Sequence, residues 1–169
     1  MSSMSNQMAA LFRYLTLGVH VVGVAQGGRR NAFTAAWIMQ VSFDPLLLAL
    51  SINPQSASYR LLCESGSFVV TVLKAHQLEL ARQFGTPSAG SSDKLAAARW
   101  RPARSGAPIL QDGLAYFDCD ITAKMRTGDH ELVIGRVVDG RILDASASPL
   151  IYQATGDMDD SAALYPAAF

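Results

Sequence analysis

Short apolar runs separated by turn residues make up most of the chain, which is the pattern of a mainly β protein. Residues 17–26 are rich in valine and lead into Gly27 and Gly28, so they predict a hairpin. Residues 46–52 are apolar except for Ser51, which implies a strand buried on both faces. Residues 68–73 predict another apolar strand. Many short strands at regular intervals favour a closed barrel.

The second half of the chain predicts two strands joined by a turn. Residues 114–124 alternate between apolar and polar side chains, so one face is expected in the core and the other in solvent. Residues 127–129 predict a turn before a strand at 132–138. Asp139 and Gly140 are a type I′ hairpin signal, which predicts that the chain reverses there. The expected core side of residues 114–124 holds Phe117, Cys119 and Ile121, and the expected solvent side holds Asp118, Asp120 and Thr122.

Three short helices are predicted between the strands. Residues 6–15 place apolar side chains at intervals of three and four, which fits an amphipathic helix that packs on the core as a lid or end plug. Residues 58–64 predict a second helix, which Gly66 stops. Residues 76–84 predict a third helix, which ends at Gly85.

The remaining segments are expected on the surface. Residues 86–92 are small, polar and rich in turn formers, which predicts a mobile loop rather than a linker between domains. Residues 100–108 carry arginines between two prolines and predict an irregular basic segment. Residues 155–169 predict an extended C-terminal arm that is either mobile or packed on a partner.

Length and charge narrow the class of protein. A chain of 169 residues suits one domain, residues 1–169, and half of its residues are apolar, enough for a substantial core. The 14 basic and 14 acidic residues balance, so no basic field attracts nucleic acid or an anionic membrane. The longest apolar run, residues 46–50, is too short to cross a bilayer, and the N-terminus has no basic segment leading into an apolar core. We therefore expect a soluble cytoplasmic protein.

The cysteines and histidines form no familiar metal motif. Cys63 and Cys119 are far apart, with no CxxC pair, so they fit a reducing compartment and are expected to be small buried hydrophobes. His20, His76 and His130 are equally scattered, which argues against a zinc site. GxGxxG and GxxxxGK are absent, so neither a Rossmann dinucleotide site nor a P-loop is indicated.

The stretch from residue 31 to residue 59 carries the strongest indication of a binding site. Residues 31–42 mix small residues and hydroxyls with Trp37, which leaves a backbone that a large flat ligand can approach closely. Residues 53–59 end a strand and offer Ser56 or Ser58 as a helix N-cap. Helix N-termini hold phosphate well. Each feature alone has an ordinary counterpart, because small residues before proline form turns and serines before helices cap them.

Taken in this order, the segments resemble the flavin reductase-like, FMN-binding split-barrel family over about residues 11–158. The resemblance implies a mainly β split barrel with short peripheral helices. It also implies a homodimer that binds FMN, or sometimes FAD, in a groove at the dimer interface and passes hydride to it from NADH or NADPH. The residues that carry the resemblance are Thr34, Ala35, Ala36 and Trp37, residues 41–45, Ser51, Ile52 and Asn53 with Ser56 and Tyr59, residues 93–95, and residues 128–130.

The resemblance also implies a role for each of these positions. Residues 31–37 are expected along the flavin ring, with backbone amides and the Thr34 hydroxyl at its polar edge. Ala35 and Ala36 stand where many relatives carry serine, which removes possible side-chain donors. Trp37 is either a ring contact or an ordinary core or interface aromatic. The implied flavin-binding set is Asn31, Thr34, Ala35, Ala36, Trp37, Ser51, Ile52, Asn53, Ser56, Tyr59 and Lys94, in which Ser51, Asn53 and Ser56 hold the ribityl chain and phosphate.

Two positions carry an open alternative. Lys94 matches an Asp-Lys pair of the family and is expected to neutralise the phosphate, whereas a lysine in a surface loop is the ordinary case. His130 is the candidate catalytic residue, expected to bond the nicotinamide nucleotide at the barrel rim. The alternative for His130 is a turn histidine exposed to water or bonded to Asp129.

The implied function is reduction of flavin by NADH or NADPH, with the reduced flavin supplied to a separate monooxygenase. The flavin performs the electron transfer itself, so few ionisable catalytic groups are required. One alternative is a protein that stores flavin or shuttles electrons without enzymatic activity. Another is a structural dimerisation barrel that binds no cofactor.

Overall fold

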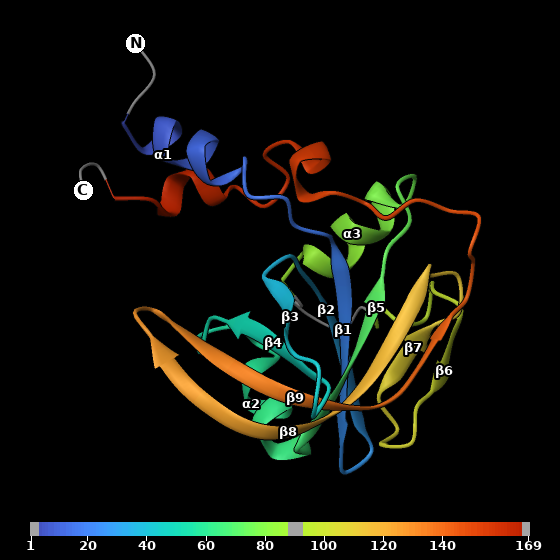
Figure 1. The fold of residues 1–169 in the computed structure, drawn as a ribbon. Helices are drawn as coiled ribbons and strands as arrows, with labels where there is room; N and C mark the ends of the chain where they lie inside the picture. The colour runs from blue at the N-terminus through green and yellow to red at the C-terminus, as the bar shows by residue number, and fades with distance from the viewer. Residues whose placement is uncertain (1–3, 88–92, 167–169) are drawn as a thin grey trace.

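The computed structural model describes residues 4–87 and 93–166. Its elements are α1 (Met4–Phe12), β1 (His20–Gln26), β2 (Arg29–Ala35), β3 (Ile38–Ser42), β4 (Leu47–Ile52), α2 (Tyr59–Ser65), β5 (Ser67–Val72), α3 (Leu78–Gly85), β6 (Trp100–Pro102), β7 (Pro108–Leu110), β8 (Ala115–Thr127), β9 (His130–Ile142), η1 (Tyr152–Thr155) and η2 (Ser161–Leu164). Seven strands form one antiparallel sheet in the order β2-β1-β5-β8-β9-β4-β3 (Figure 1). The prediction of a mainly β fold with short helices is confirmed.

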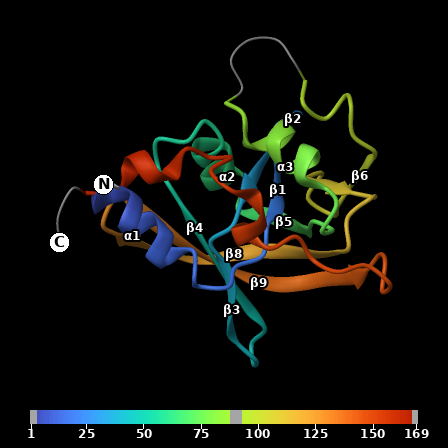
Figure 2. The same ribbon diagram turned by 90° about the horizontal axis from the view of Figure 1, so that it is seen from above.

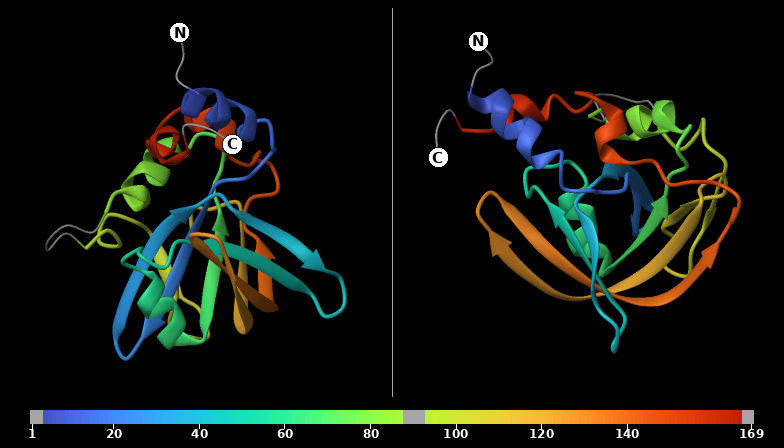
Figure 3. Two further views of the ribbon diagram at one scale, coloured as in Figure 1. Left: turned by 90° about the vertical axis from the view of Figure 1, so that its left-hand side faces the viewer. Right: turned by 45° about the horizontal axis from the view of Figure 1, so that its top comes forward.

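The sheet curls into a split barrel. Its two edge strands are β2 and β3, and only Ala36 and Trp37 separate them in the chain. The two edges must therefore meet at that end, while the sheet order contains no β2–β3 ladder to close the wall along its length. Figure 3 shows β1, β2 and β5 on one side, β3 and β4 on the other, and the long β8 and β9 bending between them.

Buried apolar side chains fill the barrel and the space under the covering segments. The largest cluster lies inside the barrel and includes Leu50, Phe68 and Cys119, all 0% exposed. A second cluster lies beneath α3 and includes Phe84. Burying a leucine or phenylalanine side chain contributes about 1.5–3 kcal/mol, so these clusters are the main stabilising term. The apolar runs at residues 46–52 and 68–73 do form the strands β4 and β5, and most of their side chains are buried.

The β8–β9 hairpin is longer than its sequence pattern suggests. The turn at Gly128 and Asp129 is confirmed, and Gly128 has a φ of 64°. The predicted reversal at Asp139 and Gly140 is wrong, because β9 continues through both residues and pairs them with β8. A Cβ on Gly140 would lie 2.9 Å from the carbonyl oxygen of Tyr116, so this glycine allows close strand approach rather than a turn.

The predicted solvent face of β8 is wrong at Asp118. The pairing of β8 with β9 shifts register between Asp118 and Cys119, and such a bulge changes which face successive side chains share. Both residues are consequently buried, at 1% and 0% exposed. Burial raises the pKa of the Asp118 carboxyl, against an opposing effect of the Arg104 guanidinium, whose Nε lies 3.9 Å from Oδ2. Thr122 is exposed, as predicted.

The chain ends pack on each other. The predicted N-terminal helix is present as α1, and the predicted extended arm instead forms η1 and η2, with η2 beside α1 (Figure 2). The rings of Phe12 and Tyr165 stack at 5.5 Å, and Arg13 pairs with Asp157 at 3.1 Å. The C-terminal segment is therefore anchored on its own chain, which the composition of the tail did not indicate.

The predictions for the two remaining surface segments had different outcomes. Residues 100–108 are not irregular throughout, because Trp100 to Pro102 pair with Pro108 to Leu110 in the β6–β7 ribbon. Most of the predicted loop at 86–92 lies outside the described residues. Across the described part of the chain, no helix has the length and apolar character needed to cross a membrane.

Candidate functional site

Trp37 and Ser51, two of the residues predicted to bind flavin, meet where β2 passes into β3. The backbone N–H of Ser51 donates to the carbonyl of Trp37 at 2.9 Å, which holds the start of β3 against β4. Ile52 at the end of β4 pairs with Glu131, the residue after His130. Sheet pairing therefore brings together three segments that are far apart in the sequence.

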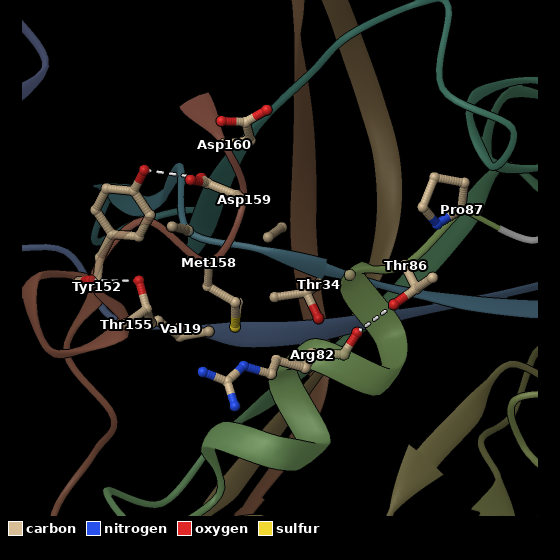
Figure 4. A pocket seen from close by; sticks show the side chains of 13 residues that line it. Val19, Thr34, Arg82, Thr86, Pro87, Tyr152, Thr155, Met158, Asp159 and Asp160 are labelled. Atoms are coloured by element: carbon tan, nitrogen blue, oxygen red, sulfur yellow. Dashed lines mark hydrogen bonds between the residues drawn. The ribbon is translucent and has the colours of Figure 1, made fainter. Parts of the chain in front are cut away.

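A cavity of about 540 Å³ with charged residues in its walls lies on one side of this junction (Figure 4). Thr34, Ala35 and Ala36 form one wall, and the end of α3 and residues 152–160 form the others. Two carboxylates, Asp159 and Asp160, line it together with one guanidinium, and this charge balance disfavours a phosphate dianion there. The Thr34 hydroxyl donates to the carbonyl of Ala81 at 2.6 Å, so its proton is already used and only acceptor capacity remains.

An apolar groove of about 580 Å³ lies on the other side of the junction. Its volume falls within the range of small-molecule sites. Trp37 and Ser51 line it together with the aromatic residues Phe12, Tyr152 and Tyr165. Trp37 is 45% exposed, so it is not a core residue. An exposed aromatic wall with a serine hydroxyl beside it can accept a flat ring.

The loop between β4 and α2, residues 53–58, is called the serine loop below. Ser58 is buried, and its hydroxyl accepts a hydrogen bond from the Asn31 amide at 2.8 Å. Ser58 stands at the N-cap of α2, as predicted, but its side chain makes no cap hydrogen bond. The Asn53 side chain accepts from the N–H of Gln55 at 2.9 Å and so shapes the loop.

Ser56 differs from its neighbours in the serine loop. Its hydroxyl oxygen is buried and has no hydrogen-bond partner among the described residues. Buried polar atoms in proteins are almost always hydrogen-bonded, so an orphan of this kind indicates a missing partner. A phosphate oxygen is a strong acceptor, and the Ser56 hydroxyl fits it as a donor.

Two further members of the predicted set lie beside the serine loop. Ile52 is 4% exposed and part of the core, so only its backbone can face a ligand. The Tyr59 hydroxyl donates to Glu131 Oε2 at 2.8 Å. That bond raises the pKa of the Tyr59 phenol, with Cys63 as the next contributor. Tyr59 is thus held in place rather than free to turn toward solvent.

His130 follows the turn between β8 and β9. Its ring Nδ1 lies 2.8 Å from Asp129 Oδ1, and this contact lowers the pKa of the Asp129 carboxyl. The ring centroid lies 4.8 Å from that of Trp37, with the planes tilted by 45°. His130 therefore has the bond to Asp129 that an ordinary turn histidine makes, and it also contacts a residue that lines the apolar groove.

Lys94 lies apart from these residues. Its ammonium donates to the carbonyl oxygens of Phe84 and Thr86, at the end of α3. Burial lowers the pKa of the Lys94 amine. Within the described part of the chain, the structure places Lys94 against the end of α3 and not against the serine loop.

Sequence reasoning missed Glu131 and misjudged Cys63. The Cys63 sulfur is only partly buried and lies 3.3 Å from the Lys124 ammonium, whereas Cys119 is buried as expected. Glu131 lies 3.7 Å from the same ammonium. Its position directly after His130 was the only signal in the sequence. The described residues contain no group of three or more His, Cys, Asp or Glu side chains placed to hold a metal ion.

Comparison with known proteins adds a family match and partial alignments. The family model of the flavin reductase-like domain matches residues 12–159. A Nostoc protein named diflavin flavoprotein A 6 is 35% identical over 125 residues, which are 73% of this chain and 22% of that protein. The chain spans 22% to 27% of the length of the diflavin flavoproteins that it matches.

Two solved structures share the fold at low identity. The NADH:FAD oxidoreductase SgcE6 of Streptomyces globisporus is 26% identical, with a TM-score of 0.82 over 88% of both chains. BorF, the flavin reductase component of a bacterial two-component tryptophan halogenase, is 29% identical, with a TM-score of 0.81 over 89% of this chain and 94% of that one.

Proposed function

Because the chain belongs to the family of flavin reductase-like domains, we propose that it transfers hydride from NADH or NADPH to FMN, with FAD as the alternative flavin. The observation that carries this proposal is the unpartnered Ser56 hydroxyl, which lies in the loop a few residues after Ser51, a residue that lines the apolar groove. A flavin has the phosphate and the large flat ring that these features suit. The name of the similar Streptomyces enzyme adds support for a nicotinamide donor.

Different residues of the chain bind and orient the flavin and the nicotinamide nucleotide. The flavin supplies the hydride-accepting chemistry when it is bound, so the protein has to hold and orient it. Ser56 donates to phosphate, while Asn31 and Asn53 keep the serine loop in shape. Trp37 and Ser51 offer an aromatic wall and a hydroxyl to the ring. His130 bonds the nicotinamide nucleotide and holds it in a reactive pose.

We further propose that the reduced flavin serves a separate flavin-dependent monooxygenase. BorF, which shares this fold, is the reductase component of a two-component system, and that likeness supports the same division of labour here. The open apolar groove fits a flavin that leaves after reduction, because one of its walls faces solvent at Trp37.

A homodimer is part of the same proposal. The edge strand β3 and the turn after it expose Met39, Val41 and Phe43, at 62%, 44% and 91%. Adjacent exposed apolar side chains on an unpaired edge are an unstable surface in water, and a second copy would cover them. Light scattering of the flavin-loaded protein at micromolar concentration should give twice the chain mass. A monomer mass would contradict the dimer.

The test of the function combines a spectrum with a rate. Purified protein should be yellow or should quench FMN fluorescence on titration, and NADH or NADPH should bleach the oxidised flavin without air. Flavin binding without bleaching by either nucleotide would indicate flavin storage or electron transfer instead. Failure to saturate up to about millimolar FMN, an affinity below roughly 4 kcal/mol, would leave a dimerisation barrel without cofactor.

A further inference from the structure

Glu131 joins three elements at the base of the β8–β9 turn. It is the second residue of β9, and its Oε2 accepts a hydrogen bond from Tyr59, the first residue of α2, at 2.8 Å. Its Oε1 lies 3.7 Å from the ammonium of Lys124 on β8. Tyr59 and Glu131 are 72 positions apart in the sequence. This carboxylate is therefore a polar contact between the helix after the serine loop and the hairpin that carries His130, beside the contact of Cys63 with Lys124.

The Glu131 carboxylate is mostly buried and has few partners. The side chain is only 12% exposed, and Oε1 makes no hydrogen bond to any described residue. A carboxylate removed from water to that extent depends on the partners it has. The Tyr59 phenol has a raised pKa, first because of its bond to Glu131, and the Lys124 amine has a raised pKa because of Cys63 and then Glu131. Both donors thus keep their protons over the working pH range.

The geometry of β9 connects this contact to His130. Successive side chains of a strand point to opposite faces, so Glu131 faces α2 while His130 faces Trp37. Among the described residues, the His130 ring contacts Asp129 in the turn and the ring of Trp37, which is 45% exposed. A shift of Glu131 along or across the strand would therefore move the His130 ring.

We propose that Glu131 is a positioning residue, which transmits the placement of the serine loop through Tyr59 to His130 and so aligns the nucleotide with the bound flavin. This inference rests on the proposed function and adds a coupling between its two binding steps. The hydrogen bond from Tyr59 carries the coupling, and the ion pair with Lys124 holds the carboxylate in the orientation that receives it.

The variants Tyr59→Phe and Glu131→Leu each break the hydrogen bond, and Glu131→Gln keeps an acceptor for Tyr59. At saturating FMN, we expect the first two to slow anaerobic bleaching by NADH or NADPH, or to raise KM for the nucleotide, by about tenfold. The double variant should lose no more than the larger single loss, because both changes remove one contact. Glu131→Gln should recover most of the rate.

Tyr116→Phe is the matched control. The Tyr116 hydroxyl donates to Asp139 Oδ2, also at 2.8 Å, and this bond joins β8 to β9 far from the turn. The control should keep the wild-type rate and KM while losing as much thermal stability as Tyr59→Phe. If Tyr116→Phe slows bleaching as much as Tyr59→Phe does, the loss reflects a general loosening of the hairpin. That result would overturn the proposed coupling of Tyr59 to His130 through Glu131.

A measurement without flavin or nucleotide tests the same point. The Cε1 proton resonance of His130, assigned by its loss in His130→Ala, should move in Tyr59→Phe, although the Tyr59 hydroxyl bonds Glu131 and not His130. It should stay in place in Tyr116→Phe. An unmoved resonance in Tyr59→Phe, or strictly additive rate losses in the double variant, would overturn the inference. If wild-type protein binds FMN but neither NADH nor NADPH bleaches the bound flavin, the proposed function alone is overturned. The His130 resonance would still decide whether Tyr59 and His130 are coupled.

Discussion

The two ends of the β8–β9 hairpin contain the same bond in different surroundings. At the turn end, Tyr59 donates to Glu131 at 2.8 Å, and at the open end Tyr116 donates to Asp139 at the same distance. Each end also has a buried carboxylate oxygen without a hydrogen-bond partner among the described residues, on Glu131 and on Asp118. Local bonding alone would assign both ends the same role.

The residues around the two ends of the hairpin differ in how accessible they are to a ligand. At the turn end, His130 lies against Trp37, which is 45% exposed and lines the apolar groove. At the open end, Asp118 is 1% exposed and lies under the side chain of Arg104, where a ligand has no access. Perturbed polar groups indicate function when a ligand can reach them and structure when it cannot. We therefore expect changes at the turn end to alter activity and changes elsewhere in the hairpin to alter stability.

The largest expected effect is in the middle of the hairpin. A Cβ on Gly135 would lie 2.6 Å from the Phe68 ring and 2.9 Å from Cys119 Cβ, and both partners are 0% exposed. Gly135→Ala should cost about 3 kcal/mol, measured as a lower urea midpoint at unchanged slope. Gly128→Asn at the turn is the control, because a Cβ there meets nothing within 4 Å and asparagine tolerates the positive φ. Equal losses of stability in Gly135→Ala and Gly128→Asn would contradict the difference between the middle of the hairpin and its turn.

The next effect concerns the serine loop beside the turn end. Ser56→Ala removes the unpartnered hydroxyl, so FMN affinity should fall about thirtyfold, or about 2 kcal/mol, in a fluorescence titration. Riboflavin lacks the phosphate and should bind almost as before. If both ligands lose affinity equally, Ser56 shapes the loop and does not bind phosphate.

A smaller effect is expected at His130 itself. His130→Ala should leave FMN affinity unchanged and slow flavin reduction about tenfold, through KM, kcat or both, because the nucleotide spends less time in a reactive pose. Anaerobic stopped-flow bleaching over a range of NADH or NADPH concentrations measures this. If the variant bleaches at the wild-type rate throughout that range, His130 is an ordinary turn residue without a role in hydride transfer.

The smallest expected effect is a pH-dependent change in folding stability at the open end of the hairpin, at Asp118. The folded pKa of Asp118 is raised by burial, so the folded state holds this proton more tightly than the unfolded chain and loses stability as pH rises above the ordinary carboxyl range. Asp118→Asn removes the charge, while Arg104 keeps its 2.5 Å contact with Asp120. The variant should be about 1 kcal/mol more stable than wild type near neutral pH, and the difference should shrink toward pH 4. Flavin reduction should not change.

Local sequence patterns predicted most of the fold. The apolar runs at residues 46–52 and 68–73 became β4 and β5, and the glycine turns after β1 and β8 fell where expected. These features depend on side chains within a few positions of one another, where burial and turn geometry act directly. The order of small residues, serines and the turn at Gly128 also indicated the family before any tertiary contact was known.

Tertiary structure decided what depends on a distant partner. Asp118 is buried because of a register shift against β9. Gly140 continues a strand because it pairs with Phe117, and the lack of a side chain leaves room for the Tyr116 carbonyl. The C-terminal arm is ordered by α1, at the other end of the chain. Apart from its place directly after His130, nothing in the sequence marks Glu131, because its hydrogen-bond donor is Tyr59, 72 positions away. The sequence determined where strands and turns form, whereas the pairing of strands determined which polar groups lose water and which face a ligand, since burial is a property of the assembled sheet.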